Sequence, residues 1–212
     1  MGTGDFFSPS IPQELPVRDS ILQVACGKEF SIIRSYDNEV FVTGNNEYHQ
    51  LGLNIEARCL NTWLFLELYE ISSIACGGSF SIYLNTYGEV YGVGDNRYGQ
   101  LGTQEPQRMD VPTLVPLTVP MTKISCGISH TMCLDSNGSL WTFGLNNNGR
   151  LGVPPTTMIH KPIKLAKPKE VEVLSSGGVV SLVKTKDGTV AMLGQMKNLP
   201  VAGSRINSGG SY

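Results

Sequence analysis

Short apolar segments alternate with glycine-containing turns along most of the chain, and this pattern recurs every fifty residues. In the stretch 71–120, a Gly-Gly pair and the turn 85–88 separate three apolar segments, 71–76, 80–84 and 89–93. Short runs of β-branched and aromatic residues between glycine turns are typical of strands, and nothing at helical period is long enough to compete. The pattern predicts an antiparallel meander of three or four strands per fifty residues.

Glycine, leucine and small side chains keep fixed places in this repeat. The recurring positions are Cys26, Gly27, Gly44, Leu51 and Gly52; Cys76, Gly77, Gly94, Leu101 and Gly102; Cys126, Gly127, Gly144, Leu151 and Gly152; and Gly177 and Gly194. We expect the glycines at 44, 94 and 144 to need a positive φ or a close approach of neighbouring strands. We also expect the three cysteines to be buried at equivalent strand ends. Asn137-Gly138 and Asp187-Gly188 predict hairpins with type I′ turns.

Apolar positions also recur, so each copy presents more apolar surface than one small sheet can bury. Three such sets of positions are Val24, Ile74, Ile124 and Leu174; Ile32, Ile82, Met132 and Leu182; and Val40, Val90, Leu140 and Val190. This surface must be buried between copies, and small sheets stacked radially make a β-propeller of about 4–8 blades. The sequence therefore predicts an all-β fold.

The repeat also sets the expected domain boundaries. Residues 1–20 form a lead-in, and residues 21–212 form one propeller unit with repeats 21–70, 71–120, 121–170 and 171–205 and a truncated fifth repeat, 206–212. The fourth repeat lacks the Leu-Gly pair, and Ile206–Tyr212 aligns with Ile74–Phe80. About four blades favour a partial propeller, with a small closed four-bladed ring as the alternative.

The repeat closely resembles the regulator of chromosome condensation repeat. The second copy reads I-x-x-I-A-C-G-G-S-F-S and then G-E-V-Y-x-x-G-D-N-x-Y-G-Q-L-G, and the third adds the segments Cys126–Thr131 and Leu140–Gly144. The resemblance covers nearly everything from about residue 21 onward. It implies a propeller, seven-bladed in the best-known members of the family, and it implies either a scaffold or a factor that exchanges guanine nucleotide on a small GTPase.

Composition and charge exclude several classes of function. A formal charge of −2 gives no general footprint for direct binding of nucleic acid or of an anionic membrane, and no segment approaches the length of a membrane span. The five cysteines fit reduced thiols in an intracellular protein, cytoplasmic or nuclear. No histidine pairs at metal-ligand spacing, and no nucleophile or dinucleotide motif is present, so we expect no enzyme, metal site or cofactor.

The sequence therefore predicts a non-enzymatic scaffold for protein–protein interaction, with specificity in the segments that vary between copies. Candidate partner contacts are Trp63, Phe65, Lys161, Lys164 and Lys167. The alternative interpretations are an outer strand packed on its own blade for residues 63–66, and a solvated loop for the lysines. The alternative function is nucleotide exchange on a Ran-like small GTPase. We also expect self-association through open blade faces.

Overall fold

The computed structural model describes residues 20–154 and 156–194, and these residues form four antiparallel sheets with a single turn of 3₁₀-helix. The all-β prediction is confirmed. The elements are β1 (Ile21–Cys26), β2 (Phe30–Ser35), β3 (Val40–Asn45), β4 (Cys59–Leu66), β5 (Ile71–Cys76), β6 (Phe80–Asn85), β7 (Val90–Asp95), β8 (Arg108–Leu114), β9 (Met121–Cys126), β10 (His130–Asp135), β11 (Leu140–Leu145), η1 (Asn147–Gly149), β12 (Met158–Lys164), β13 (Val171–Gly177), β14 (Val180–Thr185) and β15 (Val190–Leu193).

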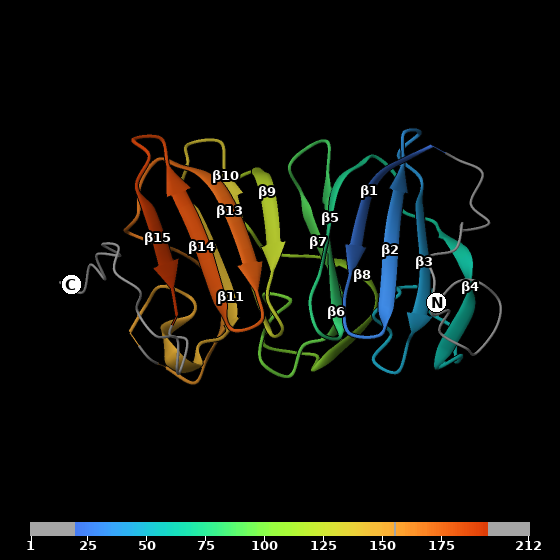
Figure 1. Ribbon diagram of the computed structural model, residues 1–212. Helices are drawn as coiled ribbons and strands as arrows, with labels where there is room; N and C mark the ends of the chain where they lie inside the picture. The colour runs from blue at the N-terminus through green and yellow to red at the C-terminus, as the bar shows by residue number, and fades with distance from the viewer. Residues whose placement is uncertain (1–19, 155, 195–212) are drawn as a thin grey trace, which may run out of the picture.

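Each sheet is a simple meander in chain order: β1–β4, β5–β8, β9–β12 and β13–β15. We call these sheets blades 1 to 4. Figure 1 shows the blades side by side in sequence order, with blade 1 and blade 4 at opposite ends of an arc. The described residues therefore form part of a propeller, with three four-stranded blades and a fourth of three strands. The predicted fifth repeat, 206–212, and the lead-in up to residue 19 lie outside the described residues.

The cores of the fold lie between blades rather than within them. At the first junction, Phe30, Ile32 and Val40 of blade 1 pack against Ile74 and Tyr83 of blade 2. The next two junctions repeat this arrangement. In each blade the residues that face the following blade come from alternate positions of the second and third strands, because successive side chains of a strand point to opposite faces. Burial thus depends on having a neighbour.

Backbone hydrogen bonds also join the first loops of successive blades. The Lys28 N–H donates to the Gly78 carbonyl at 3.0 Å, the Gly78 N–H to the Ile128 carbonyl at 3.0 Å, and the Ile128 N–H to the Gly178 carbonyl at 2.9 Å. Side chains add to this: the Ser81 hydroxyl donates to the Gln50 carbonyl at 2.6 Å. Polar and apolar contacts therefore repeat together at each junction.

The hairpins form where the sequence predicted them, but the type I′ turn is wrong. Gly138 and Gly188 have φ of 73° and 88°, whereas Asn137 and Asp187 are not among the residues with positive φ. A type I′ turn needs a positive φ at both central residues. The loop is instead closed by the strand-end carboxylate, since Asp135 accepts the N–H groups of Asn137 and Ser139 at 2.9 Å each.

The cysteine prediction is correct for position, but for burial it is correct only for Cys126. Cys26, Cys76 and Cys126 end β1, β5 and β9, as expected. Cys126 is buried, Cys76 is half-buried and Cys26 is exposed. The difference arises because β5 and β9 each lie against a preceding blade, whereas blade 1 has no such neighbour among the described residues.

Candidate functional site

The repeated loop after the third strand is built around a buried asparagine. The Asn96 side chain donates to the carbonyls of Thr103 and Pro106 at 3.0 and 2.8 Å, and its oxygen accepts the Leu101 N–H at 2.9 Å. Asn46 and Asn146 make equivalent bonds, and Leu51, Leu101 and Leu151 are buried below them. Both polar atoms of the Asn96 amide bond to groups of the loop that follows the third strand. These bonds hold in place the loop that carries the more variable side chains.

The repeated glycines admit close neighbours. A Cβ at Gly27, Gly77 or Gly127 would lie within 2.0 Å of the ring at Phe30, Phe80 or His130, respectively. Gly94 has φ of 105°, and a Cβ there would lie 2.6 Å from the Ser79 carbonyl oxygen. The glycines at 44, 144 and 194 also have positive φ, as do those at 52, 102 and 152, whereas Gly177 has open space around it. These positions shape the scaffold.

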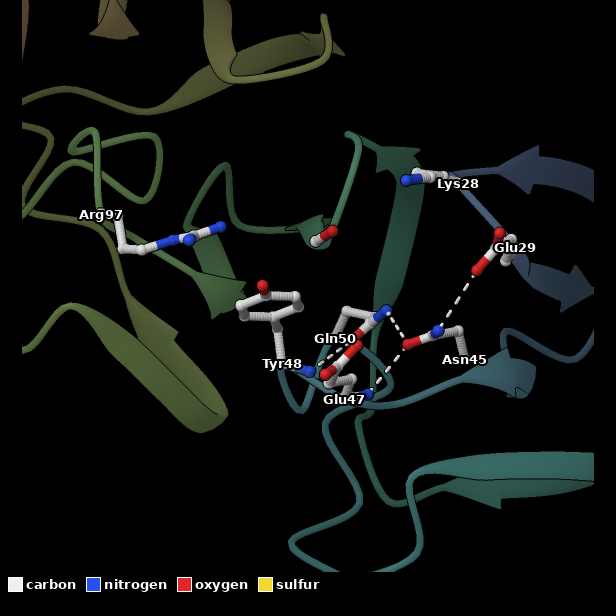
Figure 2. Close-up of a pocket in the computed structure, with 8 residues that line it drawn as sticks. Lys28, Glu29, Asn45, Glu47, Tyr48, Gln50 and Arg97 are labelled. Carbon is white, nitrogen blue, oxygen red and sulfur yellow. Dashed lines mark hydrogen bonds between the residues drawn. The ribbon is translucent and has the colours of Figure 1, made fainter.

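The loops after the first and third strands of each blade lie on one face of the molecule, which we call the loop face. A polar pocket of about 240 Å³ opens on this face at the junction of blades 1 and 2 (Figure 2). It is lined by Lys28, Glu29, Asn45, Glu47, Tyr48, Gln50, Ser79 and Arg97. Its wall is fixed by hydrogen bonds: the Gln50 amide donates to Asn45 Oδ1 and accepts the Tyr48 N–H, both at 2.9 Å. Gln50 is buried, so the repeat framework itself supports the pocket.

Blade 2 places a guanidinium over an aromatic ring of blade 1. The Arg97 guanidinium carbon lies 4.8 Å from the centre of the Tyr48 ring, and the same group makes two bonds to Asp95, at 2.9 and 3.1 Å. The hydrogen bonds to Asp95 raise the pKa of Arg97. The guanidinium is thus held by both the ring and the carboxylate, and the side chain remains about half exposed. A planar, half-exposed guanidinium on a ring is typical of recognition surfaces.

Two further charged side chains of the pocket are free to pair with another molecule. Lys28 and Glu47 are exposed and form no ion pair with any residue that the structure describes. Glu29 accepts only a long hydrogen bond, 3.4 Å, from Asn45. The pocket holds no histidine, cysteine or buried carboxylate, and no cluster of metal-ligating side chains occurs among the described residues. The lining offers charged groups of both signs and hydrogen-bonding groups.

A second hollow, of about 440 Å³, lies on the other face between blades 3 and 4, and it includes one predicted contact, Lys164. Lys164 lies 3.8 Å from the Asp135 carboxylate and 6.0 Å from the centre of the Trp141 ring. Asp135 also accepts the Trp141 indole N–H, and its several bonds lower its pKa against the opposing effect of burial. Lys161 is exposed within β12, and Lys167 is exposed beside the hollow without lining it.

Trp63 and Phe65 lie on the outer strand β4 of blade 1. Phe65 is 38% exposed and packs edge-on against Phe41 of the same blade, with ring centres 5.8 Å apart. Trp63 is half-buried. The structure therefore places both residues away from the loop-face pocket and from the three lysines. For Phe65 the contact within its own blade agrees with the alternative interpretation of an outer strand packed on its own sheet.

Sequence reasoning missed the pocket itself. The available signal was substitution at fixed repeat positions: Lys28 stands where the other copies have Gly78, Ile128 and Gly178, and Glu47 stands where they have Arg97 and Asn147. The contact between Tyr48 and Arg97 joins residues forty-nine positions apart. Spacing alone does not show that equivalent loops of adjacent blades face one another.

No helix among the described residues is long and apolar enough to cross a membrane. A comparison of the sequence with curated proteins finds no match. The sequence model of the regulator of chromosome condensation (RCC1) repeat matches residues 37–84, 87–134 and 137–184, three segments of 48 residues that together cover 144 of the 212. A second model of the same repeat matches 21–50, 71–100 and 121–150.

Solved structures of similar proteins share this fold. Human WBSCR16 is 25% identical, with a TM-score of 0.75 over 87% of this chain and 50% of its own. Yeast RCC1 (Prp20), solved bound to Kap60, is 21% identical, with a TM-score of 0.75 over 87% and 45%. Prp20p from Saccharomyces cerevisiae, whose binding to Gsp1p and histones has been studied, is 20% identical, with a TM-score of 0.74 over 84% and 46%.

The chain spans about half the length of these structures. The fold, the fifty-residue repeat and the matched segments agree with one another, and the matched segments cover well over half of the chain. The chain therefore belongs to the regulator of chromosome condensation (RCC1) repeat family.

Proposed function

We propose that this protein is a non-enzymatic scaffold that binds a protein partner at the polar pocket between blades 1 and 2. One observation carries the proposal: Lys28 and Glu47 are exposed and unpaired among the described residues, beside an Arg97–Tyr48 stack that is already held in place. Fixed side chains lose little conformational entropy on binding, and exposed charges supply specificity. The partner surface is a loop that carries both an acidic and a basic side chain.

The location of the pocket supports a binding role over a structural one. Hydrogen bonds among Asn45, Tyr48 and Gln50 fix the wall, and the charged side-chain groups of Lys28 and Glu47 form no hydrogen bond with any described residue. Variable side chains on a repeated framework are where such folds place recognition. The five cysteines are all free thiols, which fits the proposed intracellular location.

The test immobilises the wild type, a pocket variant and a control variant, and compares the proteins that each retains from a cell extract. The pocket variant combines Lys28→Glu with Glu47→Lys, and the control combines Lys169→Glu with Glu170→Lys on the opposite face, so that net charge is unchanged in both. We expect quantitative mass spectrometry to find proteins that bind the wild type and the control and are lost from the pocket variant. Identical sets on all three chains would show that the pocket does not select a partner.

Nucleotide exchange on a Ran-like GTPase is the second candidate, because a solved relative is described together with its binding to Gsp1p. Such activity acts through binding and remodelling, so it needs no catalytic side chain. The measurement is the release of fluorescent GDP from Gsp1p with and without the chain. The scaffold proposal expects an unchanged release rate, since binding at the pocket does not in itself remodel a nucleotide site. Accelerated release would make exchange the function.

A further inference from the structure

The face of blade 4 that points away from blade 3 exposes positions that are buried in every other blade. Leu182 is 48% exposed, whereas Ile32, Ile82 and Met132 at the same repeat position are each 0% exposed. Val190 is 59% exposed, whereas Val40, Val90 and Leu140 are at most 1% exposed. Val173 on the same face is 45% exposed. Blade 4 therefore presents one half of a blade junction without its complement among the described residues.

The other half of a junction is exposed at blade 1. In every junction the first strand of one blade lies against the first two strands of the blade before it. Val24 on β1 is 67% exposed, whereas Ile74 at the same position of β5 is 3% exposed. Cys26 on this strand is exposed as well. The chain thus carries both complementary halves of one junction, at opposite ends of the arc.

The backbone hydrogen bonds between first loops end in the same complementary way. Three such bonds run from Lys28 to Gly178, each from the N–H of one blade to the carbonyl of the next. Among the described residues, the Gly178 N–H and the Lys28 carbonyl have no hydrogen-bond partner. The donor is on blade 4 and the acceptor on blade 1, so a fourth bond of the same kind can join them only between two copies.

Charge also favours a head-to-tail arrangement. Residues 20–70 of blade 1 contain three basic and seven acidic side chains, a formal charge of −4, and residues 171–194 of blade 4 contain two basic and two acidic side chains, a formal charge of zero. Two blade 1 ends would repel each other, whereas the neutral blade 4 of one copy can meet the acidic blade 1 of another without repulsion.

We propose that two copies of this chain associate head to tail into one closed ring, with the Leu182 and Val190 face of each blade 4 packed on β1 of the other copy. Both interfaces reproduce the internal junctions, with the Gly178 N–H donating to the Lys28 carbonyl of the second copy. Heterologous contacts of this kind close into a ring when the rotation per copy permits, and eight blades lie within the range that propellers use.

Sedimentation of the wild-type chain over a range of concentrations should show a monomer–dimer equilibrium. Replacing Leu182 and Val190 together by Lys should raise the dissociation constant by about 100-fold, because unpaired charges would be buried at both interfaces. The control replaces Val111 and Leu114 on the outer strand β8 by Lys; these residues are 45% and 51% exposed and lie outside every junction. We expect this control to dimerise like the wild type.

A mixing experiment separates a broken interface from a misfolded chain. The chain with Val24→Lys keeps a native blade 4 face, and the chain with both Leu182→Lys and Val190→Lys keeps a native β1. Each variant alone should be monomeric, and their mixture should form a one-to-one complex through the one interface that remains intact. A mixture that stays monomeric would overturn the proposal.

Cysteine labelling gives a local measurement within a single chain. Cys26 and Cys59 are both exposed, but only Cys26 lies at the proposed interface. The Cys26 position is half-buried or buried where a preceding blade is present, so labelling of Cys26 should slow as concentration rises while labelling of Cys59 stays constant. The proposal would be overturned if Cys26 were labelled at the same rate at all concentrations, or if the wild-type chain stayed monomeric throughout. Open polymers in place of a dimer, or loss of the dimer in the β8 control, would also overturn it.

Discussion

At the scale of single residues, one repeat position shows how a polar side chain replaces an apolar one. Phe30 and Phe80 pack their rings on Gly27 and Gly77, and His130 does the same on Gly127. The imidazole is fully buried, and its Nε2 lies 2.9 Å from the Ser181 hydroxyl. Burial lowers the pKa of His130 to about 4, and the nearby charge of Arg150 contributes to this. His130 is therefore neutral in the folded protein near neutral pH.

Stability should fall in mild acid because of this histidine. The unfolded chain takes up a proton near the ordinary pKa of 6.5, while folded His130 resists protonation down to about pH 4. Its contribution is therefore complete above pH 6.5 and is lost as the pH falls towards 4, on the order of 3 kcal/mol in total. Urea unfolding of the wild type and of His130→Phe over this interval measures the difference. Parallel pH profiles for the two proteins would contradict the assignment.

Gly94 should be more sensitive to a side chain than Gly177. Gly94 combines a φ of 105° with a carbonyl oxygen 2.6 Å from the position of an added Cβ, whereas Gly177 has nothing within 4 Å. We expect Gly94→Ala to cost about 1–3 kcal/mol of unfolding free energy, the range for a strained backbone position. Gly177→Ala should cost much less. Equal urea midpoints for the two variants would show that the close approach at Gly94 is easily relieved.

At the scale of elements, the sequence predicted the features that depend on neighbouring residues in the chain, namely the strands and the positions of the turns. Alternation and glycine turns located the strands to within a few residues, since both signals act locally. The turn type was wrong because the closing group is the Asp135 carboxylate at the strand end, not the Asn-Gly pair. The pocket could not be predicted, since Tyr48 and Arg97 meet only when two blades dock. The exposure of Cys26 likewise depends on a neighbour and not on its own strand.

The loop after the third strand should depend on its buried amide. Asn96→Ala removes the bonds to Thr103, Pro106 and Leu101 and leaves buried backbone groups unpaired. The expected loss is about 2–4 kcal/mol, from two or more unsatisfied groups. Asn147→Ala, at an exposed site in η1, is the matched control and should change stability by less than about 0.5 kcal/mol. Similar unfolding curves for both variants would mean that water replaces the amide at little cost.

At the scale of the whole molecule, stability should be graded along the arc, because each blade is stabilised mainly by its neighbours. Blade 2 has a blade on each side, and every residue of its β6 is buried. The same holds for β10 of blade 3. Among the described residues, blade 4 has one neighbouring blade and three strands, and half-exposed or exposed residues occupy all of β15. The central blades therefore carry most of the core.

Hydrogen exchange measured by mass spectrometry should reveal this gradient in a chain held monomeric by Leu182→Lys and Val190→Lys. We expect the slowest exchange in β6 and β10, faster exchange in β1, and the fastest in β14 and β15, because local opening requires the loss of fewer buried contacts at the ends. An Ile82→Ala substitution at the second junction should increase exchange in blades 2 and 3 more than in blade 4, since its side chain belongs to the core between those two blades. A uniform increase across all four blades would instead mean that the arc unfolds as one cooperative unit, and the dependence of each blade on its nearest neighbours would then be wrong.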